Sequence, residues 1–411
     1  MEKWKKWKEE KSVHPDGRTT SLAAAIVFYV SGHGFGHASR IVEVINAILA
    51  RRPETRIGVR TSAPRWLFDL TVKGKIAFST LECDTGVVQT DALTLDEADS
   101  IRRASAFHSD LVTRAASETR LLRELGAGLI VGDIPPLAFA VGAAAGIASI
   151  GLGNFAWDWI YSEYPRVRLA PSLLPTIRGA YAKGSMALRL PMSAGFESFS
   201  TVKDIPFIAR HATHTREEVC KLLKLPTDKP LVLMSFGGYG VPSLDTDGLT
   251  KFKKYFVMNV SNLPSGRTRK EAVSERKGSF VNINEEGMYD TGVRYEDLVG
   301  AAVAVVTKPG YGIISECIAN DAAVLYTSRG HFPEYDVLVE EMPKYLRSAF
   351  VAQDDVFSGR WEPHLDKLLA QPRAKNYKKP DTNGADVAAE ILLKTLDKPP
   401  KKSRGRPKAK F

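Results

Sequence analysis

The sequence predicts an α/β protein with two doubly wound domains that face each other across a cleft. Two glycine loops, at residues 31–37 and 307–312, each follow a short apolar run and precede a helical pattern. Strand-length apolar segments alternate with amphipathic segments in both halves of the chain. The chain has 411 residues, more than one hydrophobic core usually holds. One glycine loop is weak support, whereas two in separate halves indicate two nucleotide-type folds.

The first half begins with a strand predicted over Ala23–Val30, apolar throughout because both faces of a parallel sheet are covered. Ser31–His37 forms the glycine turn, and apolar residues at helical spacing predict a helix over His37–Ala50. This order presents unpaired backbone N–H groups and the positive end of a helix dipole to an anion. The other predicted elements of this half are strands at Arg56–Thr61, Leu129–Gly132 and Ile147–Leu152, and helices at Ser100–Leu125 and Leu137–Gly146.

The second half repeats this alternation after Ile205–Thr215, which has the composition of a linker. The charged stretch Asn262–Lys277 is predicted as a loop, and Pro309–Gly312 opens a helix from about Ile313. The other predicted elements are helices at Arg216–Leu223 and Val387–Leu396, and strands at Leu231–Phe236, Phe256–Val260, Phe280–Ile283, Ala301–Val306 and Ala322–Tyr326. The predicted organisation is a basic arm at residues 1–20, a first domain at 21–208, a second at 209–396 and a basic tail at 397–411.

The net charge of +10 is concentrated at the two ends of the chain. Residues 398–411 carry +7 and residues 1–18 carry +2, so the remaining body is nearly neutral. This excludes a generally basic, nucleic-acid-binding body. In the tail, Arg404-Gly405-Arg406-Pro407 matches the core of an AT-hook, whose arginines enter a narrow A·T minor groove. A solvated tail with weak affinity for nucleic acid or an anionic surface is the alternative that the lysine-rich composition favours.

Cysteine usage and hydropathy indicate the compartment in which the protein is expected. Cys83, Cys220 and Cys317 are widely spaced and form neither a disulfide framework nor a metal motif, which fits a reducing cytosol. No apolar run is long enough to span a membrane, and the N-terminus has no secretory apolar region. We therefore expect a cytoplasmic protein without a transmembrane segment.

A histidine and an aspartate are the candidate catalytic pair of the first half. His37 stands where the glycine turn meets the helix, and Asp133 ends a later strand at the same edge of the sheet. A neutral imidazole can take a proton from a hydroxyl, and a neighbouring aspartate fixes its tautomer and stabilises the imidazolium. We predict His37 as the general base with Asp133 behind it. His33 is the second candidate, on a loop with Gly34 and Gly36.

The second glycine loop is the candidate phosphate site. Gly310 and Gly312 let the backbone approach a ligand closely, and the amides that follow can hold a diphosphate. Glu316 is one turn into the helix, where it could accept hydrogen bonds from a ribose diol. Alternatively, Ser315 and Glu316 only favour the helix N-terminus, an effect of roughly 0.3–1 kcal/mol. A further strand–glycine turn at Gly237-Gly238 favours the phosphate interpretation.

Four motifs together resemble a known family. GHGFGHASR at residues 32–40, VGDIPP at 131–136, NFAWDWIYSEY at 154–164 and TKPGYGIISE at 307–316 resemble the glycosyltransferase-like half of plant L-arabinokinases. Both glycine loops resemble, more distantly, the N-acetylglucosaminyltransferase that forms lipid II and other GT-B enzymes. The resemblance covers roughly residues 24–395.

The resemblance implies a GT-B fold of two Rossmann-like domains, with a UDP-linked sugar donor on the C-terminal domain and the acceptor on the N-terminal one. It implies that the donor meets Gly237, Gly238, Gly310, Gly312, Ser315, Glu316, Glu334 and Asp336, the last two at the sugar hydroxyls. It implies no bound cofactor and no metal, and we interpret the DxD sequence Asp245–Asp247 as a helix cap. No sugar-kinase phosphate loop is present in the sequence, so kinase activity is not implied.

The predicted function is a metal-independent, inverting transfer of a sugar from a nucleoside-diphosphate sugar to an acceptor hydroxyl. The first alternative is a nucleotide-sugar epimerase or hydrolase, which would consume the donor without an acceptor. The second is a non-catalytic sugar-nucleotide-binding regulator with a DNA-binding tail. These alternatives stay open because a fold alone does not define a function.

Overall fold

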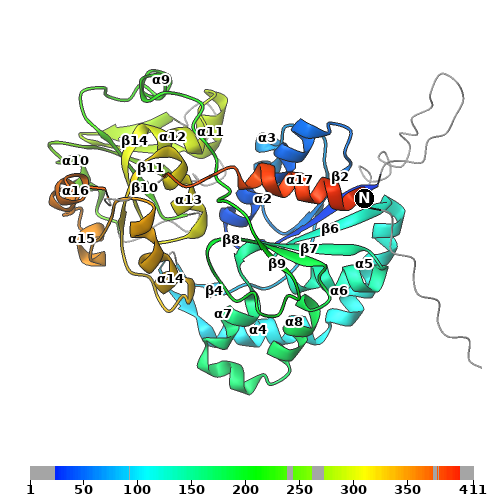
Figure 1. Cartoon of the computed structure of the whole chain (residues 1–411). Coiled ribbons are helices and arrows are strands. Elements are labelled where there is room, and N and C mark those ends of the chain that lie inside the picture. The colour runs from blue at the N-terminus through cyan, green and yellow to red at the C-terminus, as the bar shows by residue number, and fades with distance from the viewer. Residues whose placement is uncertain are drawn as a thin grey trace, which may run out of the picture.

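The computed structural model describes residues 24–91, 93–237, 244–261, 273–373, 377 and 379–398. Two α/β halves lie next to each other, with the N-terminal half on the right of Figure 1 and the C-terminal half on the left. The predicted N-terminal arm and the RGRP sequence of the tail lie outside the described residues.

The N-terminal half contains a seven-stranded parallel sheet. Its strand order is β3 (Ala77–Thr80), β2 (Ile57–Thr61), β1 (Ala25–Val30), β6 (Ala127–Asp133), β7 (Ala148–Phe155), β8 (Met186–Ala194) and β9 (Val202–Asp204). The direction in which strands are added reverses between β1 and β6. In open α/β sheets, ligands bind at this switch point, beyond the carboxyl ends of the strands. Val30 and Asp133 are register partners there, so the first glycine loop and Asp133 leave the sheet side by side.

The C-terminal half contains a second seven-stranded sheet, parallel except for one edge strand. Its order is β12 (Val273–Lys277), β13 (Phe280–Asn284), β11 (Phe256–Ser261), β10 (Leu231–Ser235), β14 (Ala302–Thr307), β15 (Ala323–Tyr326) and β16 (Ser348–Phe350). Its switch point lies between β10 and β14, where Ser235 and Thr307 are register partners. Both glycine turns predicted in this half therefore start at one point of the sheet.

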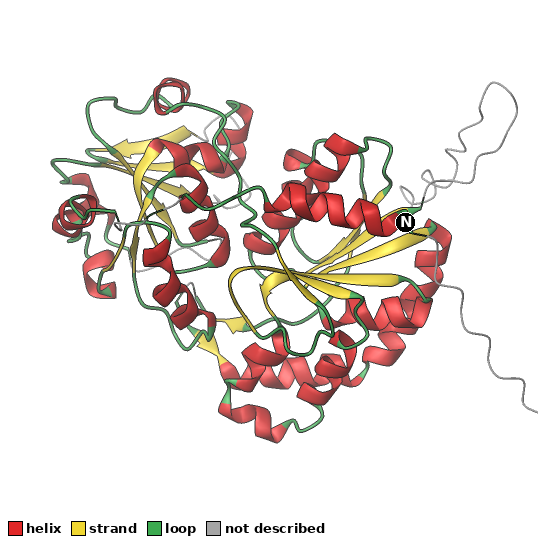
Figure 2. Cartoon of the chain, in the orientation of Figure 1, coloured by secondary structure: helices red, strands yellow, loops and turns green. Residues whose placement is uncertain are grey.

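Helices cover both faces of each sheet, as Figure 2 shows. Val27 and Tyr29 of β1 belong to one hydrophobic cluster, whereas Ile26, Phe28 and Val30 belong to another, as the alternation of side chains along a strand requires. The first cluster includes helices α4 (Glu97–Ser109), α5 (Leu111–Leu125), α6 (Pro136–Ala145), α7 (Trp157–Ser162) and α8 (Leu173–Tyr181). The second includes α2 (Phe35–Arg51), α3 (Arg65–Thr71) and α17 (Gly384–Leu396).

The second sheet is covered in the same way by two further clusters. One face packs against α9 (Arg216–Leu222), α12 (Tyr295–Ala301), α13 (Tyr311–Asn320) and α14 (Glu334–Glu341). The other packs against α10 (Thr246–Thr250), α15 (Gln353–Phe357) and α16 (Glu362–Leu369). The remaining elements are the hairpin β4 (Val88–Gln89) and β5 (Leu95–Asp96), helix α11 (Glu285–Asp290), and the 3-10 turns η1 (Pro165–Leu169) and η3 (Met342–Lys344).

Three sequence predictions differ from the structure. The helix predicted over Ser100–Leu125 is two helices, α4 and α5, which separate at Asp110 because α4 packs on α8 and α5 on α6. Val273–Lys277, predicted within a loop, forms the antiparallel edge strand β12, and its residues Arg276 and Lys277 suit a sheet edge. Helix α17, predicted with the second domain, packs by Ala388, Ala389 and Leu392 in the same cluster as Ile41 and Ile45 of α2. The chain therefore returns to the N-terminal half at its end.

The two halves also meet on the side of the cleft away from this return. The β4–β5 hairpin of the N-terminal half places Leu93 in a hydrophobic cluster of the C-terminal half. Leu93 O accepts a hydrogen bond from Gly330 N (2.5 Å), and His331 Nδ1 lies 2.9 Å from Glu97 Oε1. These contacts join the N-terminal half to the C-terminal half.

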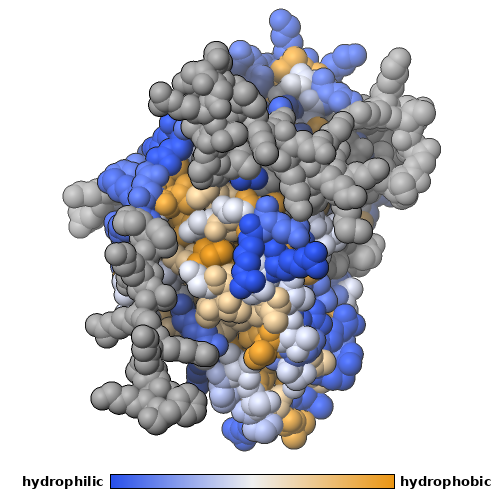
Figure 3. Space-filling model, turned by 90° about the vertical axis from the view of Figure 1, so that its right-hand side faces the viewer, coloured by the Kyte–Doolittle hydropathy of each residue, from blue (hydrophilic) through white to orange (hydrophobic). Residues whose placement is uncertain are grey.

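The face shown in Figure 3 carries small apolar patches among hydrophilic side chains, as is usual for a surface in water. Among the described helices, none combines the length and the apolar character needed to cross a bilayer.

Candidate active site in the cleft between the halves

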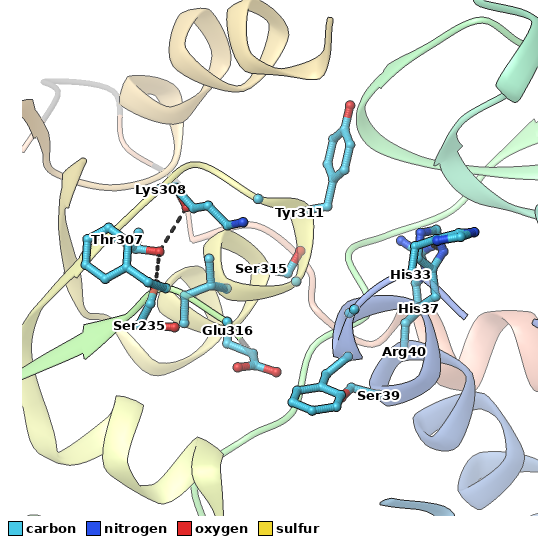
Figure 4. A pocket seen from close by; sticks show the side chains of 18 of the residues that line it. His33, His37, Ser39, Arg40, Ser235, Thr307, Lys308, Tyr311, Ser315 and Glu316 are labelled. Carbon is cyan, nitrogen blue, oxygen red and sulfur yellow. Dashed lines mark hydrogen bonds between the residues drawn. The ribbon is translucent and has the colours of Figure 1, made fainter. Parts of the chain in front are cut away.

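A cavity of about 510 Å³ separates the two halves and is lined by both glycine loops. Figure 4 shows His33, His37 and Arg40 on one side of it and Lys308, Ser315 and Glu316 on the other. This volume is within the range of pockets that bind small molecules.

The backbone conformation of the first loop explains why glycines occupy positions 32 and 34. Gly34 has φ 74°, in the left-handed region that favours glycine, and it is the N-cap residue of α2. A Cβ at Gly32 would collide with the Ser62 side chain, so this position has no room for another residue. The turn aims the first amides of α2, and the side chains of His33 and His37, into the cavity.

The predicted proximity of His37 and Asp133 is confirmed. His37 Nδ1 lies 2.8 Å from Asp133 Oδ1, and the Asp133 carboxylate is fully buried. Arg40, one turn further along α2, donates to the same carboxylate from Nη2 (2.5 Å) and Nε (2.9 Å). Burial opposes ionisation of Asp133, but the charges of Arg40 and His37 outweigh it and lower the pKa of the carboxyl. Asp133 is therefore an anion shared by two partners.

His33 has an aspartate of its own, which the sequence did not predict. His33 Nε2 lies 3.0 Å from Oδ1 of the buried Asp84. Ser31 Oγ and Trp157 Nε1 (2.8 Å) both donate to Oδ2 of Asp84. Burial opposes a charge on His33, but the hydrogen bond and charge of Asp84 outweigh it and raise the pKa of the imidazole. The cleft thus contains two histidine–aspartate pairs.

The second loop has the geometry of an anion site. Gly310 is the N-cap residue of α13, and the first turn of this helix carries no acidic residue. Ser315 is largely buried and lines the cavity. Gly237 also lines it, and its φ of 74° lies in the left-handed region that favours glycine. Thr307 Oγ1 donates to Ser235 O (2.5 Å), which ties β14 to β10 at the switch point. Gly238, predicted beside them, lies outside the described residues.

Glu316 lines the cavity but is also held by an arginine from the linker. Arg210 donates from Nε to Glu316 Oε1 (2.6 Å), and Arg210 Nη1 lies 3.3 Å from Glu296 Oε2. Burial raises the pKa of Glu316, and Arg210 opposes that rise. Burial also raises the pKa of Glu43, on α2 across the cleft, to about 7. One arginine therefore faces three carboxylates, and the ribose contact predicted for Glu316 stays a prediction.

Two further cations line the cavity near the second loop. Arg329 donates from Nη1 to Pro309 O (2.9 Å) and lies 3.7 Å from Glu334 Oε1. Its Nε is buried without a hydrogen-bond partner. Burial and the neighbouring Arg329 lower the pKa of Lys308 to about 7. Arg329 and the protonated form of Lys308 therefore place positive charge beside the glycine loop, and Glu334 balances part of it.

The predicted donor residues are not all brought together. Gly237, Gly310, Gly312, Ser315, Glu316 and Glu334 line the cavity, as do His33, Gly34, Gly36 and His37 on the other side. Asp336 is different, because it is exposed on α14 and is not among the residues that line the cavity. Glu334 begins that helix, and a residue two positions later faces away from the side of Glu334. This position gives no support to the contact predicted between Asp336 and a sugar hydroxyl, which stays a prediction.

The site also contains residues that were not predicted, and the strength of their signals in the sequence differs. Arg40 lies three positions after His37, so helical spacing already puts the two side chains on one face. Lys308 is part of the glycine loop itself. Asp84, Arg210 and Arg329 lie in irregular segments without a periodic pattern. Only the fold brings Asp84 to His33 and the two arginines to the cavity.

The DxD sequence has a structural role in this fold. Asp245 is the N-cap residue of α10, and its side chain accepts a hydrogen bond from Asp247 N (2.9 Å). Within the described residues, no group of three or more His, Cys, Asp or Glu side chains is arranged to hold a metal ion.

Comparison with solved structures defines the class of fold. The calicheamicin glycosyltransferase CalG4 aligns with a TM-score of 0.58, over 93% of this chain and 100% of that one, at 13% identity. A UDP-glucosyltransferase from Polygonum tinctorium aligns with a TM-score of 0.55, over 92% of this chain and 100% of that one, at 14% identity. The glycosyltransferase VinC, solved with dTDP, aligns with a TM-score of 0.54, over 91% and 95% of the two chains, at 13% identity. The protein has the GT-B fold of glycosyltransferases.

Comparison of sequences gives a more specific relationship. The chain is 28% identical over 388 residues to L-arabinokinase of Arabidopsis thaliana, which confirms the similarity predicted from the four motifs. The match covers 92% of this chain but 35% of that protein, so the chain spans about a third of the length of its relative. No family model matches the chain.

Proposed function

We propose that this protein is a glycosyltransferase that moves a sugar from a nucleoside-diphosphate sugar to an acceptor hydroxyl. The observation that carries the proposal is the cavity between the halves, where a helix N-terminus and two cations face two histidine–aspartate pairs. One side has the properties of a diphosphate site, and the other can accept a proton. An inverting transfer of a glycosyl group from a diphosphate uses both.

In this proposal, the donor binds to the C-terminal half. The amides that begin α13 and the turn at Gly237 would bind the diphosphate, and Lys308 and Arg329 would balance its charge. Glu316 would meet the ribose, and Glu334 the sugar. The names of two similar folds, a UDP-glucosyltransferase and a glycosyltransferase with dTDP, support a donor of this class. A UDP-linked sugar is our first expectation.

In this proposal, the acceptor binds to the N-terminal half. Its hydroxyl would lose a proton to a histidine of the first loop, and the oxygen would attack the anomeric carbon of the sugar. The bond from that carbon to the diphosphate oxygen would break, and the electron pair would leave with the diphosphate. One displacement of this kind inverts the anomeric centre. We propose that it proceeds without a metal, because fixed amides and cations at the leaving group can supply the stabilisation, about 3–4 kcal/mol per donor.

We also propose that the protein is cytoplasmic. Cys83, Cys220 and Cys317 are buried free thiols, which supports the cytoplasm as its compartment.

Thermal unfolding with UDP, dTDP, GDP and ADP tests the donor site. A ligand at 100 times its dissociation constant adds about 2.7 kcal/mol to the free energy of unfolding. We expect one diphosphate to raise the midpoint, and Gly310→Val to abolish that rise by blocking the amides. Lys394→Ala, at an exposed ion pair of α17 outside the cavity, is the matched control. A protein that responds to none of the four would contradict the proposal.

Product analysis then separates the alternatives. A transferase releases the diphosphate faster when a suitable acceptor is added, whereas a hydrolase or epimerase consumes the sugar nucleotide without one. A non-catalytic regulator binds the sugar nucleotide and leaves it intact. Removing residues 399–411 should leave turnover unchanged if the tail serves another purpose.

A further inference from the structure

Arg210 reaches the cavity from the linker that joins the two halves. Its side chain is largely buried, with 13% of its surface exposed, and it lines the cavity together with Glu316. Nε and Nη2 of the guanidinium each lie 2.6 Å from Oε1 of Glu316. Hydrogen bonds between charged groups are among the strongest in proteins. Arg210 therefore fixes one oxygen of the carboxylate that the proposed function assigns to the ribose.

The backbone around Arg210 is tied to the C-terminal half. Asn320, the last residue of α13, donates from Nδ2 to Arg210 O (3.0 Å) and accepts at Oδ1 from Ala212 N (2.8 Å). Asp297 Oδ1 accepts a further hydrogen bond from Thr213 N (2.7 Å). The linker segment that carries Arg210 is thus attached to the same helix that carries Glu316. The position of the arginine relative to the carboxylate does not depend on the guanidinium contact alone.

The surroundings of the guanidinium keep it charged. Nη1 lies 3.3 Å from Glu296 Oε2, and Cζ lies 5.4 Å from the centroid of the Tyr295 ring. Burial opposes the charge of Arg210, but Glu316 and Glu296 outweigh it and raise the pKa of the guanidinium. The charge also acts on Glu43 of α2, across the cleft. Oε1 of Glu316 is therefore in contact with a permanent cation.

The second oxygen of Glu316 is available to a ligand. Both arginine contacts are to Oε1, and among the described residues no donor is within hydrogen-bond distance of Oε2. Figure 4 shows the Glu316 carboxylate directed from α13 into the space between the halves. A carboxylate oxygen has two lone pairs, enough to accept one hydrogen bond from each hydroxyl of a ribose diol.

The place of Glu316 along α13 suits a ribose. Gly312 and Glu316 are four positions apart, so they lie on one face of the helix, separated by one turn of about 5.4 Å. Both line the cavity. The amides at the start of α13 would bind the diphosphate in the proposed function. The ribose is the group next to the diphosphate in a nucleotide, so it would come to lie one turn further along the helix, at Oε2.

We propose that Arg210 is a positioning residue that holds Glu316 as a fixed, charged acceptor for the ribose diol, and that the donor is a ribonucleoside diphosphate sugar rather than a 2′-deoxyribonucleoside one. This inference rests on the proposed function. A site built to accept a hydrogen bond from a hydroxyl rejects the analogue without it, because a buried polar group is then left unpaired. Sugars linked to dTDP, which has no 2′-hydroxyl, should therefore be poor donors.

Calorimetric titration with UDP and 2′-deoxy-UDP, and with the same pairs of GDP and ADP, tests the preference. We expect the ribonucleotide that binds best to bind about ten-fold or more tighter than its 2′-deoxy form, since a hydrogen bond to a charged acceptor is lost. In Arg210→Met this ratio should fall to a few-fold or less. Both ligands carry the same diphosphate, so effects of the substitution on the phosphate site cancel in the ratio. Equal affinities in the unchanged protein overturn the proposal.

A double substitution shows whether Arg210 acts through Glu316. Glu316→Gln should lower the ratio as Arg210→Met does. Adding Arg210→Met to Glu316→Gln should then change the ratio no further, because the two residues form one unit. If the second substitution lowers the ratio again by the same factor, Arg210 acts independently of Glu316 and the positioning role is overturned.

The chain contains a matched control for the loss of a buried arginine. Arg60 donates to Glu118 from Nε (3.0 Å) and Nη2 (2.5 Å), and the two side chains are 9% and 10% exposed. Neither lines the cavity. Arg60→Met should destabilise the fold in a similar way and leave the ratio unchanged. A fall as large as that in Arg210→Met would show that the preference is lost through general destabilisation.

Asn320→Ala provides a second variant in case Arg210→Met does not fold. It keeps the guanidinium but removes the two hydrogen bonds that attach the linker to α13, and Asn320 does not line the cavity. We expect the ratio to fall in the same direction. A ratio that is unchanged in every folded variant of Arg210 and Asn320 overturns the proposal. Binding of dTDP in preference to UDP, GDP and ADP overturns it too, while leaving the proposed function in place. Failure of all four diphosphates to bind would instead overturn the proposed function.

Discussion

Gly312, at the start of α13, lies directly across the cleft from Gly36, at the start of α2. A Cβ at residue 312 would be 3.5 Å from the Gly36 Cα. Nearby, Tyr311 stacks on Phe155 of the other half, with ring centroids 5.9 Å apart. The two helix N-termini thus approach each other with no side chain between these glycines. The distance between the halves at this point depends on residue 312 being small.

Substitutions of Gly312 should show how large a side chain the approach to Gly36 tolerates. Gly312→Ala places its Cβ at an ordinary van der Waals distance, so we expect diphosphate binding to be within a few-fold of the unchanged protein. Gly312→Leu has no such room and should push the halves apart, with a loss of roughly ten-fold or more in affinity. Calorimetric titration with UDP measures both. Equal affinities for the two variants would mean that the glycines need not lie this close during binding.

Arg210 is predicted to stabilise the folded chain through the carboxylates that it faces. Its removal leaves Glu316 and Glu296 with a buried negative charge that has lost its partner, which typically costs about 3–5 kcal/mol. Denaturant unfolding of Arg210→Met at pH 7 should show a loss of this size. The loss should become smaller as the pH falls, because the carboxyls can then bind protons. Arg189→Met, which breaks an exposed ion pair with Asp204, is the control and should change little.

The parts of the site that could be predicted from the sequence follow from sheet geometry. An apolar strand, a glycine turn and a helix start are local patterns, and the carboxyl ends of parallel strands lie at one edge. His37 and Asp133 could therefore be placed together although 96 positions separate them. The same geometry applies to the turns at Gly237 and Gly310, because they follow the neighbouring strands β10 and β14.

The parts that could not be predicted depend on packing between distant segments. Asp84 lies beyond the end of β3 in an irregular segment, and Trp157 and Ser31 contact it only after the sheet and α7 have formed. Arg210 belongs to a linker whose course depends on both halves. The return of α17 to the N-terminal half depends on its apolar face fitting α2, and sequence position suggested the opposite.

Glu43 should make stability depend on pH near neutrality. Burial raises its pKa in the folded chain to about 7, from an ordinary value of 4.5. Between these values the folded state binds a proton that the unfolded state does not, so the free energy of unfolding should fall as the pH rises through this window. Glu43→Gln cannot titrate, and its stability relative to the unchanged protein should rise from pH 5 to about pH 8. Parallel profiles would show that Glu43 titrates normally.

Lys308 should make diphosphate binding depend on pH. Burial and the charge of Arg329 lower its pKa to about 7, although Glu334 and Asp91 act in the opposite direction. A bound diphosphate favours the ammonium form, so binding near pH 7 should take up a proton. Affinity should then be highest where Lys308 is already charged and should fall as the pH rises from about 7 to 9. Titration calorimetry with UDP in buffers of different ionisation enthalpy measures both the proton uptake and the affinity. Lys308→Met should bind more weakly and lose most of this pH dependence, whereas Lys344→Met, at an exposed ion pair outside the cavity, should keep it. An unchanged pH profile in Lys308→Met would mean that another group takes up the proton.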